Sequence, residues 1–124
     1  MKYFKITEFT CKCGCNSCEM DKKFLLMIDR ARGFAGTPFK ITSGYRCITH
    51  NKNVGGSKTS SHQYGYAADI KYSTELQLVR IIYGLTKAGF SRIGINANTK
   101  FVHVDCDPDK PDAIFTYWKE CCHV

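Results

Sequence analysis

The chain has 124 residues, a length that suits one domain, and 44% of them are hydrophobic, which is enough to build a buried core. Eighteen Lys and Arg residues against 11 Asp and Glu give a formal net charge of +7. The basic residues are spread along the chain, which suits either ordinary solubility or a polyanionic partner such as a cell wall, a nucleic acid or a membrane surface. The sequence has no run of about 18 apolar residues, which excludes a transmembrane helix.

Residues 1–20 are expected to be irregular and to be held together by a cluster of cysteines. This segment lacks the apolar stretch and the cleavage site of a signal peptide, so we expect a protein made in the cytoplasm. Without an export signal, free thiols or a metal site are favoured over a disulfide framework. The cysteine spacing is tighter than in paired C-x-x-C zinc motifs, so reduced or partly bridged thiols are an alternative to a second metal. The cluster consists of Cys11, Cys13, Cys15 and Cys18.

Residues 21–36 are predicted to form a helix that ends at Gly36, because apolar residues recur at helical spacing. A short strand is expected in residues 39–46, followed by a polar, glycine-rich loop over residues 50–61. The apolar stripe of the predicted helix consists of Phe24, Met27, Ile28, Ala31 and Phe34.

The second half of the chain is predicted to contain three strands, over residues 66–72, 92–96 and 101–105, and a helix over residues 73–90. Thr74 and Gln77 form a plausible capping box for this helix, and Gly89 suits its end. A short helix is also expected in residues 111–122. This mixture predicts a small single α+β domain over residues 1–124, with an antiparallel sheet and flanking helices. The apolar stripe of the 73–90 helix consists of Leu76, Val79, Ile82, Tyr83 and Thr86.

The stretch FVHVD combines a histidine and an aspartate on one face of a predicted strand. Because side chains alternate along a strand, His103 and Asp105 share a face, while the two valines face the core. His62, Asp69 and His103 together are two imidazoles and a carboxylate, a set suited to zinc with a fourth position left for water. Asp105 is then placed either to act as the general base or to orient a ligand. Spacing alone forms no compact zinc signature.

Three motifs resemble those of the M15 family of zinc peptidases, nearest the D-alanyl-D-alanine carboxypeptidase-like group found in bacteria and in phage endolysins. The motifs are, in order, SGYRCITHNKNVGG, SSHQYGYAADI and FVHVD. The opening EFTCKCGC also resembles the start of many phage-borne members. The resemblance covers nearly the whole chain. The family's S-x-H-x-x-G-x-A-x-D core corresponds here to Ser60, His62, Gly65, Ala67 and Asp69.

This resemblance implies a zinc site held by His62, Asp69 and His103. It also implies that Arg46 binds the substrate's carboxylate or steadies the tetrahedral oxyanion, and that Ser60 supports the loop or the substrate. The implied activity is hydrolysis of peptidoglycan stem peptides, at D-Ala-D-Ala, at L-Ala-D-Glu or at cross-links. We expect a monomer that acts on the cell wall after release from the cytoplasm, or as part of a virion.

The sequence departs from several relatives at Lys100 and Phe101, where those relatives carry an acidic residue or a second histidine before the last zinc ligand. A related fold in hedgehog signalling proteins keeps the zinc site without clear peptidase activity. A non-catalytic, zinc-stabilised module that binds the cell wall or belongs to a virion is therefore the alternative. A nucleic-acid binder is suggested by charge alone, because no basic helix or base-stacking motif stands out, and we expect no nucleic-acid partner.

Overall fold

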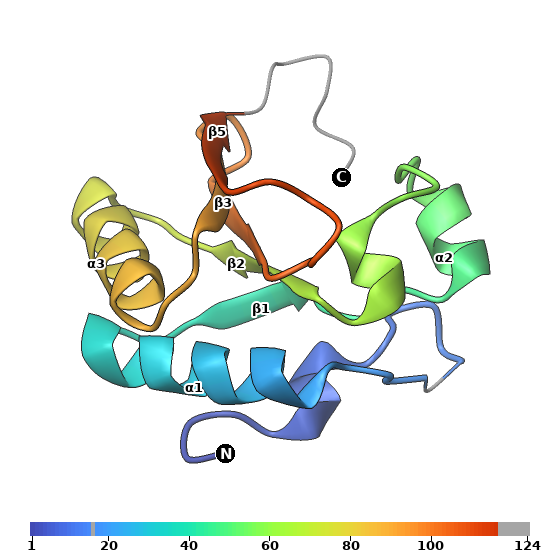
Figure 1. Ribbon diagram of the computed structural model, residues 1–124, viewed down its shortest axis with the longest axis horizontal. Coiled ribbons are helices and arrows are strands. Elements are labelled where there is room, and N and C mark those ends of the chain that lie inside the picture. The colour runs from blue at the N-terminus through green and yellow to red at the C-terminus, as the bar shows by residue number, and fades with distance from the viewer. Residues whose placement is uncertain (16, 117–124) are drawn as a thin grey trace.

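A five-stranded mixed sheet lies at the centre of the computed structural model, which describes residues 1–15 and 17–116 (Figure 1). Its strands run in the order β1-β2-β4-β3-β5. Neighbouring strands are antiparallel except for β3 and β5, which pair in parallel. The strands are β1 (Lys40–Ser43), β2 (Ala67–Lys71), β3 (Arg92–Asn96), β4 (Phe101–Asp105) and β5 (Ala113–Thr116).

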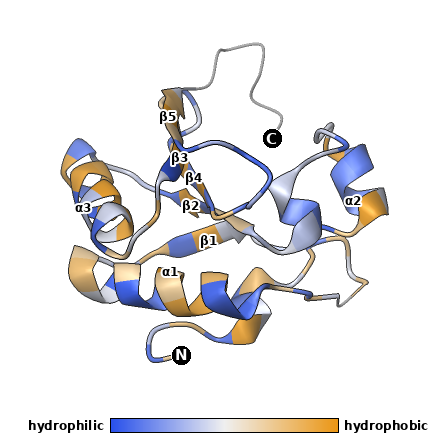
Figure 2. Ribbon diagram, viewed as in Figure 1, coloured by the Kyte–Doolittle hydropathy of each residue, from blue (hydrophilic) through white to orange (hydrophobic). Residues whose placement is uncertain are grey.

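Two long helices, α1 (Lys22–Ala35) and α3 (Glu75–Lys87), pack against each other beside the sheet (Figure 1). Both are amphipathic, and hydrophobic and hydrophilic residues alternate in bands along them (Figure 2). Their buried residues join strand residues of β2, β3 and β4 in one hydrophobic core. The remaining helices are short: η1 (Ile6–Phe9), α2 (Ile48–Asn53) and η2 (Ser61–Tyr64). None of the helices in the described ranges is long and apolar enough to span a membrane.

Side-chain alternation divides the two central strands into an apolar face and a polar face. Ile70 of β2 and Val102 of β4 are fully buried in the core with the helices. The residues next to them, Asp69 and His103, therefore point to the opposite face of the sheet. The fold thus places polar side chains on a face that the two long helices leave uncovered.

The predicted α+β class, both long helices and the strands over residues 92–96 and 101–105 are confirmed. Helix α1 begins where the Asp21 carboxylate accepts a 2.9 Å hydrogen bond from the backbone N–H of Phe24. It ends at Gly36, whose φ of 65° is the left-handed conformation that glycine adopts without strain. At the start of α3, the backbone N–H of Gln77 donates to the Thr74 hydroxyl at 3.1 Å.

The stripe predicted for α3 was wrong in its rotation about the helix axis. Leu76, Val79 and Tyr83 are more than half exposed. The helix instead buries Ile81, Gly84 and Leu85. A Cβ on Gly84 would overlap the backbone of α1, so the two helices touch where the smallest residue lies. Bulky residues at helical spacing therefore did not mark the contact face.

Two other predicted segments were wrong. Residues 111–122 were expected to form a helix, but β5 occupies Ala113–Thr116 and residues 117–122 lie outside the described ranges. β5 forms because it pairs with β3 and adds an edge strand to the sheet. This pairing is parallel, whereas a fully antiparallel sheet was expected. The loop expected over residues 50–61 contains most of α2, whose first turn is capped by the sulfur of Cys47.

We predict that Gly84→Ala lowers the free energy of unfolding by about 1–3 kcal/mol, because the added methyl group forces α3 away from α1. Urea denaturation followed by circular dichroism measures this loss. Val79→Ala is the matched control, since Val79 lies on the same helix and is 63% exposed. Equal stabilities of the two variants would contradict the close packing at Gly84.

Candidate metal centre

Three buried side chains, those of His62, Asp69 and His103, meet on the polar face of the sheet. Asp69 and His103 lie directly opposite each other in the antiparallel register of β2 and β4, so their side chains are neighbours. His62 comes from η2, the turn of helix just before β2. Gly65 ends η2 with a φ of 75° and lets the chain turn into the strand.

The three residues offer one donor atom each within a small volume. Nε2 of His62 lies 3.3 Å from Oδ1 of Asp69, and Nδ1 of His103 lies 3.1 Å from the same oxygen. All three donor atoms lie within 4.8 Å of one another. Two imidazole nitrogens and one carboxylate oxygen are ligands that zinc accepts, and three protein ligands leave a position for water or substrate.

The orientation of His62 fits a bound metal ion. Its Nδ1 lies 2.8 Å from the carbonyl oxygen of Gly44, so Nδ1 carries the proton and donates it to that oxygen. Its Nε2 is buried and has no hydrogen-bond partner among the residues that the structure describes. A buried nitrogen lone pair without a partner is costly, and a metal ion at this position would satisfy it.

His103 is held between two carboxylates. Its Nε2 lies 2.7 Å from Oδ2 of Asp105, on the other side of the ring from Asp69. A neutral imidazole carries one proton and can donate to only one of these carboxylates. With the proton on Nε2, the Nδ1 lone pair faces Asp69 and His62, where a cation would bind. The Asp105 carboxylate thus has the geometry of a group that orients a metal-binding histidine.

Other contacts hold Asp105 in place behind His103. Arg92 donates from Nε to Oδ2 at 3.1 Å, and the backbone N–H of Asp107 donates to Oδ1 at 3.2 Å. Both carboxylate oxygens are therefore engaged. This geometry supports the orienting role more than that of a general base, which stays a prediction.

Burial and mutual charge shift the pKa values of this group. Burial lowers the pKa of His62. Burial would also lower the pKa of His103, but its hydrogen bonds with Asp105 and Asp69 raise it overall. Burial favours a raised pKa for Asp69, but its interactions with the His62 and His103 rings lower it well below its usual range. Asp69 is thus an anion at neutral pH, as a metal ligand must be.

Arg46 and Ser60 lie beside the metal-binding group. Arg46 is 4% exposed, and its Nη2 lies 3.7 Å from Oδ2 of Asp69. Its guanidinium also donates to the Ser43 hydroxyl and the Asn51 side-chain oxygen, each at 3.1 Å. The Ser60 hydroxyl accepts a 3.3 Å hydrogen bond from the backbone N–H of His62. Ser60 therefore supports the loop that carries His62, whereas its predicted contact with substrate stays untested.

A cleft of about 550 Å³ lies against two segments of the chain, one containing Arg46 and the other containing His62. Tyr45 and Gln63, the chain neighbours of these two residues, both line it. Two lysines, Lys52 and Lys58, add positive charge to its wall. The cleft therefore has a partly cationic wall next to the two segments that carry Arg46 and His62.

Three residues that shape the centre were not predicted from the sequence: Gly44, Asn51 and Arg92. Arg92 could have been found, because the two strands of the hairpin over residues 92–105 pair Arg92 with Asp105 across the sheet. Gly44 acts through its backbone carbonyl, and the contact of Asn51 with Arg46 depends on α2. Residue type and spacing give no signal for either.

The cysteines form a second group, distinct from that of His62, Asp69 and His103. Cys11, Cys13 and Cys15 lie together, but the fourth member of the group is Cys47, and Cys18 lies apart. The sulfur of Cys18 donates to the carbonyl oxygen of Ile6 instead. All six cysteines in the described ranges are free thiols.

Comparisons with known proteins agree with the geometry of the centre. A sequence model of the Peptidase M15 family matches residues 2–105. A stretch of 33 residues is 48% identical to the zinc D-Ala-D-Ala carboxypeptidase of Streptomyces albus G. This stretch is 27% of the present chain and 13% of the carboxypeptidase, so the chain matches only a small part of that relative's length.

We predict that Asp69→Ala lowers the zinc content by one ion per chain, because it removes the oxygen that both imidazoles face. Inductively coupled plasma mass spectrometry after dialysis measures the zinc content, and circular dichroism checks that the variant is folded. Asp109→Ala is the matched control, since Asp109 is exposed and lies outside the three-residue group. Unchanged zinc content in a folded Asp69→Ala protein would exclude this site.

We predict that Asp105→Ala weakens zinc binding by about 10–100-fold, the usual effect of removing a group that orients a metal-binding histidine. Titration against a chelating zinc indicator measures the affinity of the variant and the parent protein. Unchanged zinc affinity together with lost turnover would instead identify Asp105 as the general base.

Proposed function

Because the chain belongs to the Peptidase M15 family, we propose that it is a zinc-dependent peptidase that hydrolyses peptidoglycan stem peptides. The resemblance seen in the sequence is thereby confirmed, and so is zinc as the cofactor. One observation carries the proposal: the buried donor atoms of His62, Asp69 and His103 face one position, and the lone pair of His62 has no other described partner.

The side chains around this position suit peptide hydrolysis. Bound zinc would lower the pKa of a water molecule toward about 7 and polarise the scissile carbonyl. The carbonyl of Gly44 and the carboxylate of Asp105 hold the two imidazoles with their lone pairs toward the position that zinc would occupy. Arg46 keeps a positive charge next to the centre and offers a fork to a peptide carboxylate or a developing oxyanion.

Two observations support a peptidoglycan substrate. The relative from Streptomyces albus G is named for its action on D-Ala-D-Ala, and the same reaction would need a site for a terminal carboxylate. Lys52 and Lys58 along the cleft, and the net charge of +7, suit an anionic wall and its acidic stem peptides. We further propose that the protein is a monomeric phage endolysin that reaches the wall after release from the cytoplasm or within a virion.

A second candidate is a zinc-stabilised module that binds the cell wall without cutting it. The engagement of both Asp105 oxygens behind His103 favours this candidate, because it leaves Asp105 poorly placed to take a proton from water. By the resemblance, Lys100 stands where several relatives carry an acidic residue, and Phe101 where others carry a second histidine. The two candidates share the metal centre and differ only in turnover.

We predict that the zinc-loaded protein releases the terminal D-alanine from purified stem pentapeptides. Mass spectrometry of stem peptides and muropeptides, with a chelated sample as control, detects the product. Cleavage after the first L-alanine would instead identify an endopeptidase of the endolysin type. Asp69→Asn is the matched variant, because it keeps the shape of the side chain but removes its charge, and it should release nothing.

An unchanged set of peptides, with zinc confirmed in the protein, would contradict peptidase activity. Sedimentation of the same protein with purified peptidoglycan then tests the binding module. That module predicts that the protein pellets with the wall and that no fragment is released.

A further inference from the structure

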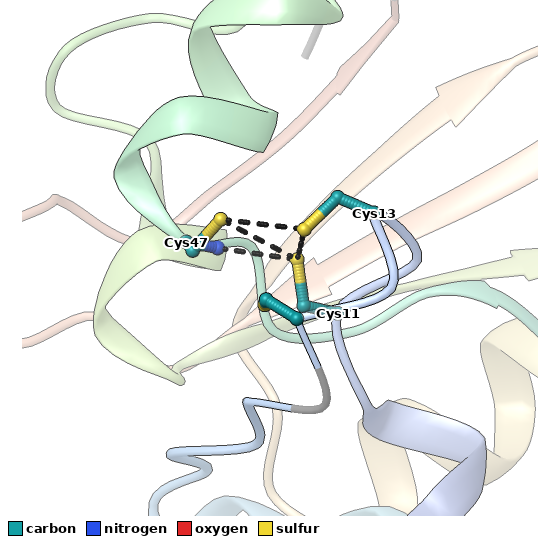
Figure 3. A group of neighbouring side chains, drawn as sticks. Cys11, Cys13 and Cys47 are labelled. Atoms are coloured by element: carbon teal, nitrogen blue, oxygen red, sulfur yellow. Dashed lines mark hydrogen bonds between the residues drawn. The ribbon is translucent and has the colours of Figure 1, made fainter.

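Four cysteine sulfurs gather where the N-terminal loop meets the start of α2. Cys11, Cys13 and Cys15 come from the loop, and Cys47 comes from the turn before the helix. Figure 3 shows the side chains of Cys11, Cys13 and Cys47 pointing toward one another. One sulfur from each of the four residues lies within 4.8 Å of the others.

The distances between these sulfurs match a shared metal ion better than a covalent bond. Cys11 and Cys13 are 3.4 Å apart at their sulfurs, Cys11 and Cys47 are 3.7 Å apart, and Cys13 and Cys47 are 3.6 Å apart. A disulfide needs about 2.05 Å. Four sulfurs at about 2.3 Å from a zinc ion at the centre of a tetrahedron lie about 3.8 Å from one another.

Backbone donors already point at two of the sulfurs. The N–H of Cys47 donates to the sulfur of Cys11, and the N–H of His50 donates to the sulfur of Cys47, each at 3.4 Å. Such donors stabilise negative charge on sulfur, which a metal-bound thiolate carries. Four thiols so close together can all ionise only if a cation offsets their charge.

We propose that Cys11, Cys13, Cys15 and Cys47 form a second, structural zinc site with four thiolate ligands. Four protein ligands fill the tetrahedron and leave no position for water, so this site holds the fold and does no chemistry. It is separate from the site of His62, Asp69 and His103, and it does not depend on peptidase activity.

The position of Cys47 gives this zinc site a mechanical role. Cys47 directly follows Arg46. Gly44, which lies two residues before Arg46, holds the ring of His62 through its backbone carbonyl. The N-terminal segment already lies against this stretch, since the N–H of Tyr45 donates to the carbonyl of Phe9 at 2.9 Å. A metal ion between Cys47 and the N-terminal loop would therefore fix the segment that positions both Arg46 and His62.

We predict two zinc ions per chain in the 124-residue protein purified with a reductant and dialysed. Cys47→Ser and His62→Ala should each lose one ion. Cys18→Ser is the matched control and should keep both, because Cys18 lies close in sequence but outside the group. Inductively coupled plasma mass spectrometry measures the zinc concentration, and its ratio to the protein concentration gives the number of zinc ions per chain.

Cobalt replacement identifies the ligands. The cobalt-loaded parent protein should show the strong near-ultraviolet absorption of thiolate-to-cobalt charge transfer. His62→Ala should keep this absorption, and Cys47→Ser should lose most of it. Cys13→Ser, at an exposed position, serves if Cys47→Ser does not fold.

A single zinc ion in the parent protein, with no thiolate absorption, would overturn the proposal. A disulfide between Cys11 and Cys47, found by mass spectrometry of alkylated peptides from protein kept under reductant, would overturn it too. Neither result bears on stem-peptide cleavage, so failure of the second zinc site is distinguishable from failure of the peptidase proposal.

Discussion

The antiparallel register between β2 and β4 is the constraint on which the metal centre depends. It sets Asp69 opposite His103 and, on the other face, Ala68 opposite Val104. A shift of one residue in either strand would exchange the faces and bury the charged pair in the apolar core. Burial of the valines and isoleucines therefore fixes the geometry of the ligands. The same apolar contacts that stabilise the fold specify where the ion binds.

The short segment from Gly44 to Cys47 contacts the metal-binding group, the N-terminal segment and the cysteine group. Its first residue approaches the backbone of Phe9 so closely that a Cβ would lie 2.7 Å away, which only glycine avoids. The same residue orients the ring of His62, and Arg46 brings its charge to Asp69. Because one stretch of backbone serves the ligands, the neighbouring charge and the N-terminal segment, a disturbance at any of them reaches the others.

Much of the centre could be predicted from the sequence, because strand alternation and the order of motifs are local properties. Strand alternation predicted that His103 and Asp105 share a face, whereas the grouping of His62, Asp69 and His103 rested on their residue types and on the family resemblance. The contact face of α3 could not be predicted, since Gly84 selects it by allowing α1 to approach. The pairing of Cys47 with residues 11–15 joins segments more than 30 residues apart in the chain, and cysteine spacing within the N-terminal loop points to Cys18 instead.

The meeting of residues 11–15 with Cys47 also has a consequence for the unfolded chain. A metal ion held by all four sulfurs would close a loop that contains α1 and β1. Closing a loop of this size by a covalent link removes conformational entropy from the denatured state worth about 4 kcal/mol. A cross-link of this kind would act before the sheet is complete, by keeping the first helix close to the turn that follows the first strand. Its main effect would be to narrow the set of conformations through which the polypeptide must search.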